Sequence, residues 1–313
     1  MDSTSPNQAA NPLIALSEAL AGVVERVGQS TLAVHGRSRH ALASGVVWKR
    51  GVMVTAAHVF RRTPAAVSVR AAGDRQLDAT LVGIDSSTDI AVFRLPDDSV
   101  AAAEIGDASA VRAGHLALAI GRSADGDVTA SQGVVNRTAG PWQTWLGGQV
   151  DCLIRLDGGL YDGLSGGPVA DAAGSVIGMA TSALSRSYGI VVPASTVSRV
   201  LDALLTQGRV ARAFIGIGAQ PVPLPTTSAA GGEPGVGLLV TSLARGGPAD
   251  QAGILVGDIV VDVAGRPATT LHELRSALAQ RIGERVRVAL LRGGAPAEAS
   301  VTVGEWPSER RAC

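Results

Sequence analysis

Apolar residues fall into short runs separated by turn residues over most of the chain from residue 30 onward. The runs are rich in Val, Ile, Leu and Ala, and up to residue 193 they are 31–34, 44–48, 52–55, 67–70, 91–95, 115–120, 128–130, 133–135, 151–155, 176–180 and 189–192. Many short strands at regular spacing, with turn residues between them, are typical of barrels and sandwiches. The segment around 96–114 divides the runs into two groups, so we expect two β-barrels.

Two segments have helical spacing instead. In 13–27, apolar residues recur at 13, 16, 20, 23/24 and 27, which predicts an amphipathic helix laid on the body of the protein. Charged residues interrupt this segment, so we expect neither a membrane span nor the core of a signal peptide there. A second helix is predicted from Ser195 to about Gln207, and Gly208 ends it.

The C-terminal third has a different pattern. Residues 218–235 are rich in Pro, Gly, Ser and Thr, which predicts a loop or extended segment. Beyond it, the predicted strands 237–242, 258–263, 286–291 and 299–303 alternate with the helical segments 248–252 and 270–280. We therefore expect four parts: a tail and helix (1–29), a β domain (30–208), a small domain (209–305) and a C-terminal tail (306–313).

Composition narrows the function. The chain has 313 residues, which suggests about two domains, and its 27 basic and 27 acidic residues give a net charge of +0. The basic residues are scattered, so we expect no nucleic acid partner. Two cysteines, Cys152 and Cys313, cannot form a disulfide framework. The sequence shows neither metal-ligand spacing nor a phosphate-binding loop, so we expect no metal and no cofactor.

Three short motifs contain the residue types of nucleophilic catalysis. Thr55-Ala-Ala-His58 ends a predicted strand, Asp89 directly precedes another, and Ser165 lies in the glycine-rich turn Gly163-Leu-Ser-Gly-Gly-Pro168. A serine nucleophile needs a histidine that takes its proton and a carboxylate that orients the histidine. A tight glycine turn lets backbone N–H groups stabilise an oxyanion. Each motif alone also fits an ordinary turn or a buried polar residue, but their joint presence favours catalysis.

The segment 163–167 also fits the G-x-S-x-G nucleophile turn of α/β-hydrolases. In that fold the acid and the histidine follow the serine. Here His58 and Asp89 precede Ser165, and His272 is the one histidine after it. The alternating strand and helix pattern of a parallel sheet is missing as well, so we reject this alternative.

From about residue 13 to residue 305, the chain resembles the HtrA (Deg) family of trypsin-like serine proteases. The resemblance is carried by 55–58, 83–92, 105–107, 119–121, 163–168, 176–178, 189–193, 214–217, 246–249, 252–259 and 263–265. It implies a mainly β chain. A twin six-stranded β-barrel protease domain would occupy 30–208, and a small α/β PDZ domain would occupy 209–305.

The resemblance also implies roles for individual residues. His58 would be the base, Asp89 the residue that orients it and Ser165 the nucleophile. The oxyanion hole would be formed by the main chain of Gly163, Leu164 and Ser165. The substrate pocket would be shallow and apolar and would be lined by Asp157, Leu160 and Ala180. Such a pocket predicts cleavage after small or medium aliphatic residues.

In the PDZ domain, C-terminal peptide tails would bind by strand addition. The residues expected to bind them are Phe214, Ile215, Gly216, Ile217, Leu274 and Leu278.

Two departures from the family pattern stand out. Leu164 occupies the position before the nucleophile, where members commonly have Asn, and no aromatic residue precedes Trp48, although aromatic residues near the N-terminus hold the family trimer together. A homo-oligomer is implied by the resemblance, but a trimer is not predicted.

We expect an ATP-independent serine endopeptidase that cleaves unfolded or damaged proteins. The alternative is a weakly proteolytic or inactive chaperone or peptide-binding scaffold. The sequence as given predicts a cytoplasmic location because no signal peptide is seen, while the resemblance leaves a periplasmic or exported location open.

Overall fold

The computed structural model describes residues 11–35, 42–60, 62–158, 160–185, 187–224, 235–279 and 281–306. The expected N-terminal tail up to residue 10 and the C-terminal tail from residue 307 lie outside the described residues. The chain divides into two compact units, residues 1–210 and residues 211–313. The sequence placed this boundary between residues 208 and 209. Each unit is described by itself.

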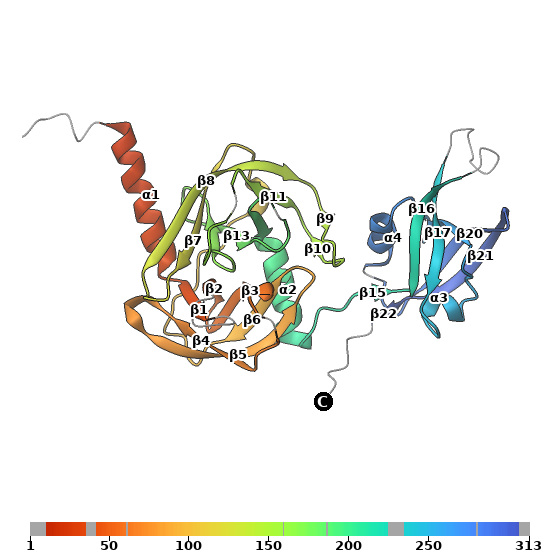
Figure 1. Cartoon of the computed structure of the whole chain (residues 1–313), viewed down its shortest axis with the longest axis horizontal. Helices are drawn as coiled ribbons and strands as arrows, with labels where there is room; N and C mark the ends of the chain where they lie inside the picture. Colours follow the sequence, from red (N-terminus) through yellow and green to blue (C-terminus); the bar gives the residue numbers. More distant parts are fainter. Residues whose placement is uncertain are drawn as a thin grey trace, which may run out of the picture. The chain divides into compact units, whose positions relative to one another are not determined.

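The first six strands of unit 1 close into a barrel in the order β1-β2-β3-β6-β5-β4 (Figure 1). They are β1 (Thr31–His35), β2 (Leu42–Lys49), β3 (Val52–Ala56), β4 (Ala66–Arg70), β5 (Gln76–Asp85) and β6 (Ile90–Arg94). Leu32, Met53 and Phe93 are fully buried inside it. Large apolar side chains therefore fill part of the barrel interior.

A second barrel follows in the order β11-β14-β13-β12-β7-β8. Its strands are β7 (Leu116–Arg122), β8 (Val128–Ala139), β11 (Leu153–Leu156), β12 (Pro168–Ala170), β13 (Val176–Thr181) and β14 (Ile190–Pro193). Between β8 and β11, the short strands β9 (Trp142–Gln143) and β10 (Gln149–Val150) pair with each other. The expectation of two six-stranded barrels is confirmed.

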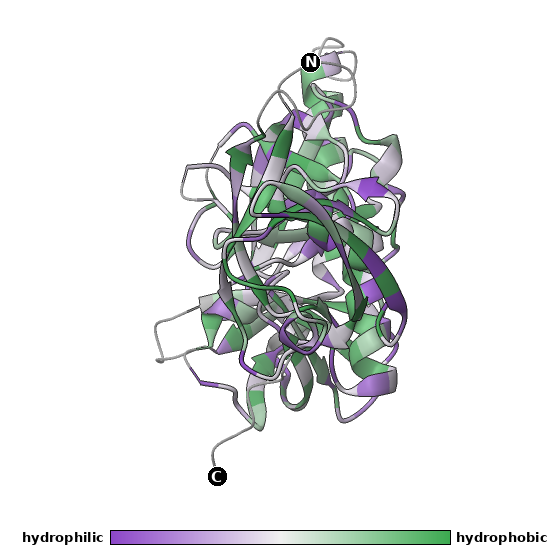
Figure 2. Ribbon diagram, turned by 90° about the vertical axis from the view of Figure 1, so that its right-hand side faces the viewer, coloured by the Kyte–Doolittle hydropathy of each residue, from purple (hydrophilic) through white to green (hydrophobic). Residues whose placement is uncertain are grey.

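One apolar core joins the second barrel to the facing strands of the first. Val54 and Ile90 of the first barrel belong to the same buried cluster as Ile120 and Met179 of the second. Figure 2 shows apolar positions recurring along the strands, interspersed with polar ones. Because this core is continuous, loops from the two barrels are held in fixed positions relative to one another.

Two helices cover this core. α1 (Pro12–Gly28) begins at Asn11, whose side chain accepts a hydrogen bond from the Leu13 N–H, and it packs on β7 and β8. α2 (Ala194–Gln207) ends at Gly208, whose φ of 69° matches the predicted helix stop. The one-turn helices are η1 (Ala57–Val59), η2 (Ala72–Asp74) and η3 (Ala108–Ala110). No helix in the described part of the chain has the length and apolar character needed to cross a membrane.

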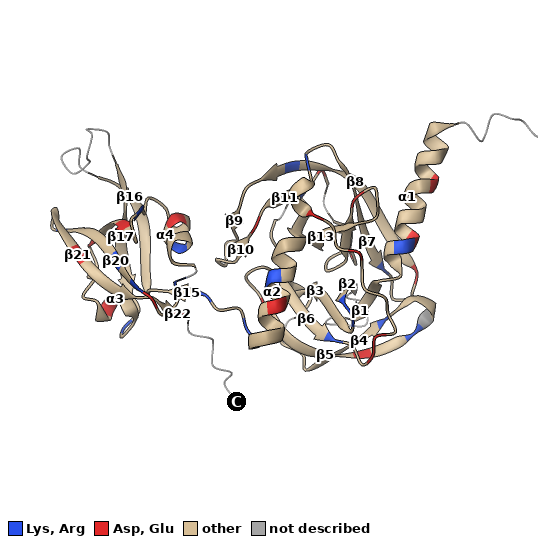
Figure 3. Ribbon diagram, turned by 180° about the vertical axis from the view of Figure 1, so that it is seen from behind, with Lys and Arg blue, Asp and Glu red and all other residues tan. Residues whose placement is uncertain are grey.

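A buried arginine connects three of these elements. Arg122 is 3% exposed, and its guanidinium donates to the carbonyl oxygens of Gly28, Thr31 and Gly126. It thereby ties the end of α1, the start of β1 and the β7–β8 turn together. The other charged residues are scattered over the ribbon (Figure 3).

Unit 2 contains a sheet in the order β16-β17-β18-β20-β21, with β19 paired to β18. Its elements are β15 (Ala213–Phe214), β16 (Ile217–Pro223), β17 (Val236–Leu243), α3 (Pro248–Gln251), β18 (Ile259–Val263), β19 (Arg266–Pro267), α4 (Leu271–Leu278), β20 (Arg285–Arg292), β21 (Ala295–Thr302) and β22 (Gly304–Glu305). Strands β15 and β22 form a separate pair.

A loop or extended segment is expected over 218–235, and at its start the structure has an extended strand. Residues up to Pro223 belong to β16, which pairs with β17 through Pro221 and Pro223. Proline is accepted in an edge strand because its missing N–H can face the open side of the sheet. A proline-rich composition therefore hides a strand here.

Candidate active site

His58 lies where β3 runs into η1, at the edge of the first barrel. Its ring Nδ1 is 2.7 Å from Asp89 Oδ2, and its backbone N–H donates to Asp89 Oδ1 at 2.8 Å. The neighbouring Ala57 N–H donates to the Asp89 carbonyl oxygen at 3.0 Å. The imidazole side chain remains 32% exposed. His58 is therefore fixed on its Asp89 side and open to solvent on its Nε2 side.

Asp89 sits at the end of a tight turn between β5 and β6. Asp85 builds this turn, because its carboxylate accepts hydrogen bonds from the hydroxyls of Ser87 and Thr88 at 2.7 Å each. The φ angle of Asp89 is 61°, a left-handed conformation that Asp tolerates better than most residues. Only 3% of Asp89 is exposed. A buried carboxylate must be hydrogen-bonded, and His58 and Thr181 supply the donors.

Ser165 lies on a turn that both barrels hold in place. Ser44 of β2 donates from its backbone N–H to the Ser165 carbonyl oxygen at 2.9 Å and from its hydroxyl to the Gly163 carbonyl oxygen at 2.7 Å. On the other side, the Gly166 N–H donates to the Ala180 carbonyl oxygen at 2.8 Å.

Glycine is required at two positions of this turn. Gly163 and Gly166 have φ angles of 90° and 87°, and a Cβ on Gly166 would lie 2.2 Å from the Ser44 carbonyl oxygen. Side chains other than glycine are strained at such φ angles. The turn therefore depends on both glycines.

The hydroxyl of Ser165 has an unexpected partner. Ser165 Oγ lies 3.0 Å from Ser182 Oγ, and Ser182 Oγ lies 3.4 Å from His58 Nε2. Ser182 directly follows Thr181, whose hydroxyl donates to Asp89 Oδ2 at 2.5 Å. Two consecutive residues at the end of β13 therefore contact all three predicted triad residues.

The expected oxyanion hole has free donors. The described residues offer no acceptor to the N–H groups of Gly163 or Ser165, whereas the Leu164 N–H donates to the Tyr161 carbonyl oxygen at 3.2 Å. The Leu164 side chain is 2% exposed and belongs to the apolar core. The departure at Leu164 therefore affects core packing and leaves the two flanking N–H groups available.

The three residues of the expected substrate pocket have different surroundings. Ala180 is fully buried directly behind the Ser165 turn, and Leu160 is half-buried against the core. The Asp157 carboxylate accepts from the Val134 N–H at 3.1 Å and so supports β8. Their common role as a pocket stays a prediction.

In unit 2, the segment 214–217 leads from β15 into the edge strand β16. The described residues offer no acceptor to the N–H groups of Ile215 and Gly216, and Gly216 has a φ of 80°. Phe214 packs edge-on against Trp306 with ring centroids 5.0 Å apart, and Ile217 begins β16. The two free N–H groups are suited to a carboxylate.

Leu274 and Leu278 of α4 lie in the core of unit 2, where they are 4% and 2% exposed. The same helix contacts β16. Direct contact of these two leucines with a bound peptide stays a prediction.

Sequence reasoning missed Ser44, Thr181 and Ser182. None of them belongs to the motifs around His58, Asp89 or Ser165. Thr181 could have been found, because a polar residue in the otherwise apolar run of β13 is unusual. Only the assembled barrels place these three side chains at the site.

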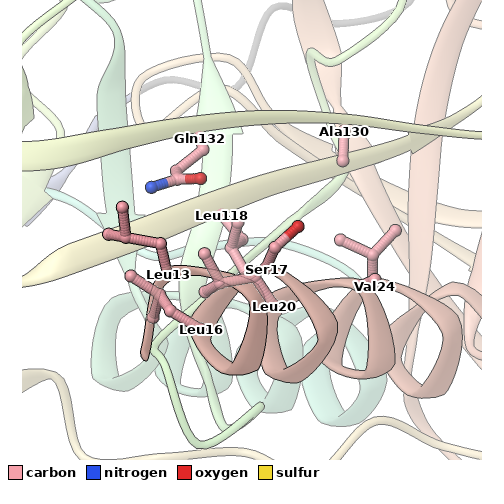
Figure 4. A pocket seen from close by; sticks show the side chains of 9 residues that line it. Leu13, Leu16, Ser17, Leu20, Val24, Leu118, Ala130 and Gln132 are labelled. Atoms are coloured by element: carbon pink, nitrogen blue, oxygen red, sulfur yellow. The ribbon is translucent and has the colours of Figure 1, made fainter. Parts of the chain in front are cut away.

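A surface hollow of about 330 Å³ lies elsewhere in unit 1, between α1 and strands β7 and β8 (Figure 4). Leu16, Leu20 and Val24 line it from the helix, facing Leu118 and Ala130 of the strands. It shares no residue with the triad. Among the described residues, no three His, Cys, Asp or Glu side chains are grouped to bind a metal ion.

Comparison with known proteins gives two family matches. Residues 43–179 match the trypsin-like peptidase domain, and residues 239–292 match the PDZ domain. Among solved structures, an HtrA-type protease AlgW with decapeptide is 25% identical with a TM-score of 0.76, covering 92% of this chain and 99% of that chain. A serine endoprotease from Yersinia pestis is 27% identical with a TM-score of 0.75, at 92% and 98% coverage. These matches confirm the expected protease-like and PDZ folds.

Curated relatives are similar over nearly the same range. A probable periplasmic serine endoprotease DegP-like of Halomonas elongata is 30% identical over 287 residues, which cover 88% of this chain and 59% of that protein. The chain thus spans about six tenths of the length of this relative. The serine protease Do-like HtrA of Bacillus subtilis is 30% identical over 310 residues, which cover 89% of this chain and 69% of that protein. From this match and the two domain matches, the chain belongs to the HtrA family of serine proteases.

Proposed function

We propose that the chain is a serine endopeptidase that uses His58 as base, Asp89 to orient it and Ser165 as nucleophile. The observation that carries this proposal is the two-point hydrogen bonding of His58 by Asp89, opposite a glycine turn that presents Ser165. A carboxylate bound to Nδ1 leaves Nε2 of the neutral ring free to accept a proton.

The reaction would proceed through an acyl-enzyme. Ser165 Oγ attacks the scissile carbonyl carbon while His58 Nε2 takes the hydroxyl proton, and Asp89 stabilises the imidazolium. The N–H groups of Gly163 and Ser165 receive the oxyanion, and each such donor is worth about 2.7–4 kcal/mol in the transition state. His58 then protonates the leaving amine, and water repeats the sequence on the acyl-enzyme.

We further propose that the substrates are unfolded or damaged proteins, cleaved without ATP after small or medium aliphatic residues. Apolar Leu160 and Ala180 next to the nucleophile turn support the aliphatic preference. A backbone in an extended conformation is needed to reach a nucleophile held between two barrels, which favours unfolded chains over folded ones.

The PDZ domain is proposed to bind C-terminal peptide tails. The free N–H groups of Ile215 and Gly216 would receive the terminal carboxylate, and the open edge of β16 would pair with the tail as an added strand. The HtrA-type protease AlgW has been solved with a decapeptide, which supports peptide binding as a property of such chains.

One observation favours the second candidate, a weakly proteolytic peptide-binding scaffold. Ser165 Oγ is bonded to Ser182 Oγ instead of His58 Nε2. A resting enzyme in this state has a nucleophile that the base does not yet contact. The two candidates differ in turnover and share the same fold and peptide site.

The compartment stays a proposal as well. Relatives named periplasmic support an exported location, and a cytoplasmic location is the alternative. Cell fractionation with detection of the intact N-terminus distinguishes the two locations.

The test of the main proposal compares the wild type with Ser165→Ala. We expect the wild type to degrade casein and to react with a fluorophosphonate probe, and we expect Ser165→Ala to do neither. Casein degradation that is equal in the two proteins would overturn the protease function. Binding of casein without turnover in both would favour the scaffold.

A further inference from the structure

Ser182 lies between the nucleophile and the base of the proposed triad. Its Oγ is 3.0 Å from Ser165 Oγ and 3.4 Å from His58 Nε2, and Ser165 Oγ has no other hydrogen-bond partner among the described residues. Ser182 is exposed at the end of β13. Its position is fixed from behind, because the preceding residue, Thr181, is fully buried and bonded to Asp89.

The direction of these hydrogen bonds follows from the tautomer of His58. The neutral ring donates from Nδ1 to Asp89, so its Nε2 can only accept. Either hydroxyl can donate in the Ser165–Ser182 contact, and when Ser182 directs its one hydrogen toward Nε2, its oxygen is left to accept the hydroxyl hydrogen of Ser165. In this arrangement the Ser165 proton points at Ser182, away from the base that has to remove it.

We propose that Ser182 is a positioning residue that keeps the resting Ser165 hydroxyl turned away from His58, so that Ser165 must break this hydrogen bond before acylation. The inference rests on the proposed protease function. It explains how an intact triad can be held in a low-activity resting state by one side chain of the second barrel.

A proton relay through Ser182 is the competing interpretation, and the distances disfavour it. A general base works across about 2.6–3.2 Å, and both steps of a relay need such contacts. The first contact satisfies this condition at 3.0 Å, but the second is 3.4 Å. The 3.4 Å contact can orient the Ser182 hydroxyl, but it is too long for the second step of a relay, so Ser182 acts as a competitor for the nucleophile.

The experiment measures the rate at which a rhodamine-tagged fluorophosphonate labels the full chain. In this reaction the Ser165 Oγ–P bond forms, the P–F bond breaks, fluoride leaves and His58 takes the proton. The variants are Ser182→Ala, which lacks the hydroxyl, and Ser182→Thr, which retains it. Ser68→Ala is the matched control, since it removes a half-buried hydroxyl whose only hydrogen-bond partner among the described residues is Gln76. Ser165→Ala defines the unlabelled background.

We expect Ser182→Ala to be labelled about threefold to tenfold faster than the wild type, because it no longer offers the competing hydrogen bond. Ser182→Thr and Ser68→Ala should react at the wild-type rate. With fluorescein-labelled casein, kcat should rise in Ser182→Ala while KM stays unchanged. A merely structural role of Ser182 would not increase kcat.

Several results would overturn the proposal and leave the protease function intact. One is an unchanged labelling rate in Ser182→Ala. Another is a slower rate in Ser182→Ala, which would indicate a relay. A third is an equal acceleration in Ser182→Thr, which would assign the effect to the size of the side chain. If neither the wild type nor Ser182→Ala is labelled, the protease function itself fails.

Discussion

The carboxylate of Asp89 holds His58 at two points, its Oδ2 2.7 Å from the ring Nδ1 and its Oδ1 2.8 Å from the backbone nitrogen. One bond sets the orientation of the ring, and the other fixes the backbone from which the ring projects. Because Asp89 is itself fixed in a left-handed turn, the whole His58 side chain has little freedom to move. This arrangement makes the proposed base sensitive to small changes in Asp89.

Asp89→Asn should abolish most of the activity without unfolding the chain. The amide oxygen can still accept from the His58 backbone N–H, but its NH₂ group would face Nδ1 and favour the wrong ring tautomer. We expect kcat to fall by about 10⁴, as in other triads of this kind. Casein turnover measures the loss, and unchanged circular dichroism serves as the control. Retention of a tenth or more of wild-type kcat would contradict the assigned role.

Thr181→Val should weaken the support of Asp89. The change keeps the buried volume but removes the hydroxyl that donates to Asp89 Oδ2. A hydrogen bond to a charged group is worth about 1.5–3 kcal/mol, so we expect kcat to fall by about tenfold to a hundredfold with KM unchanged. The matched control is Thr206→Val, since within the described part of the chain the Thr206 hydroxyl bonds only backbone oxygens of α2. Equal kcat values for the two variants would show that Thr181 has no part in catalysis.

Leu164→Asn tests the departure from the family pattern. The Leu164 side chain is buried in the core, so an amide there loses apolar contacts and lacks an evident partner. We expect the free energy of unfolding to fall by at least about 2 kcal/mol. The fluorophosphonate labelling rate of the folded fraction should stay close to wild type, because the oxyanion donors are main-chain N–H groups. A stabilised variant would mean that Asn finds partners in this turn.

The sequence predicted the parts of the molecule whose signals are local. Most barrel strands appear as apolar runs, and His58, Asp89 and Ser165 lie in motifs with recognisable neighbours. Strand β5 was not predicted, because half-buried and exposed residues are mixed along Gln76–Asp85 and no apolar run stands out. Ser182 could not be found either. It meets His58 from 124 residues away, and only the packing of one barrel on the other brings them together.

The stability of unit 2 should depend on Asp258 and Arg292. Asp258 is 2% exposed in its side chain, and Arg292 donates to both of its oxygens, at 2.9 and 2.7 Å. These bonds hold the pKa of the Asp258 carboxyl below its ordinary value. A carboxyl whose pKa is lower in the folded state contributes stability above its unfolded pKa of about 3.9 and loses it as pH falls through the folded pKa.

Arg292→Ala should therefore lower the free energy of unfolding at pH 7, because the buried Asp258 carboxylate loses both of its donors, and should lower it by less below pH 3. Urea unfolding of the full chain at the two pH values measures both effects. Arg287→Ala is the control, because Arg287 pairs with Glu298 on the exposed surface, where water screens an ion pair and leaves it little weight in stability. Equal losses for the two arginines, or a loss that does not depend on pH, would contradict this assignment.

The prolines of β16 should limit how much of a peptide tail the PDZ domain binds. Ala219, Pro221 and Pro223 are alternate residues of β16, so their backbone nitrogens face the same side of the strand. An edge-strand proline turns its nitrogen to the open side of the sheet. The open edge beyond Ala219 then offers no N–H donor to an added strand. Extending a peptide with an aliphatic C-terminal residue from three to ten residues should thus raise its affinity by less than about threefold. Each additional peptide residue that pairs with β16 would lack a hydrogen bond worth about 0.5–1.5 kcal/mol. Fluorescence anisotropy with labelled peptides measures this ratio, and Pro221→Ala should increase it by restoring a donor. A tenfold gain with length in the wild type, unchanged in Pro221→Ala, would show that the peptide does not pair along this edge.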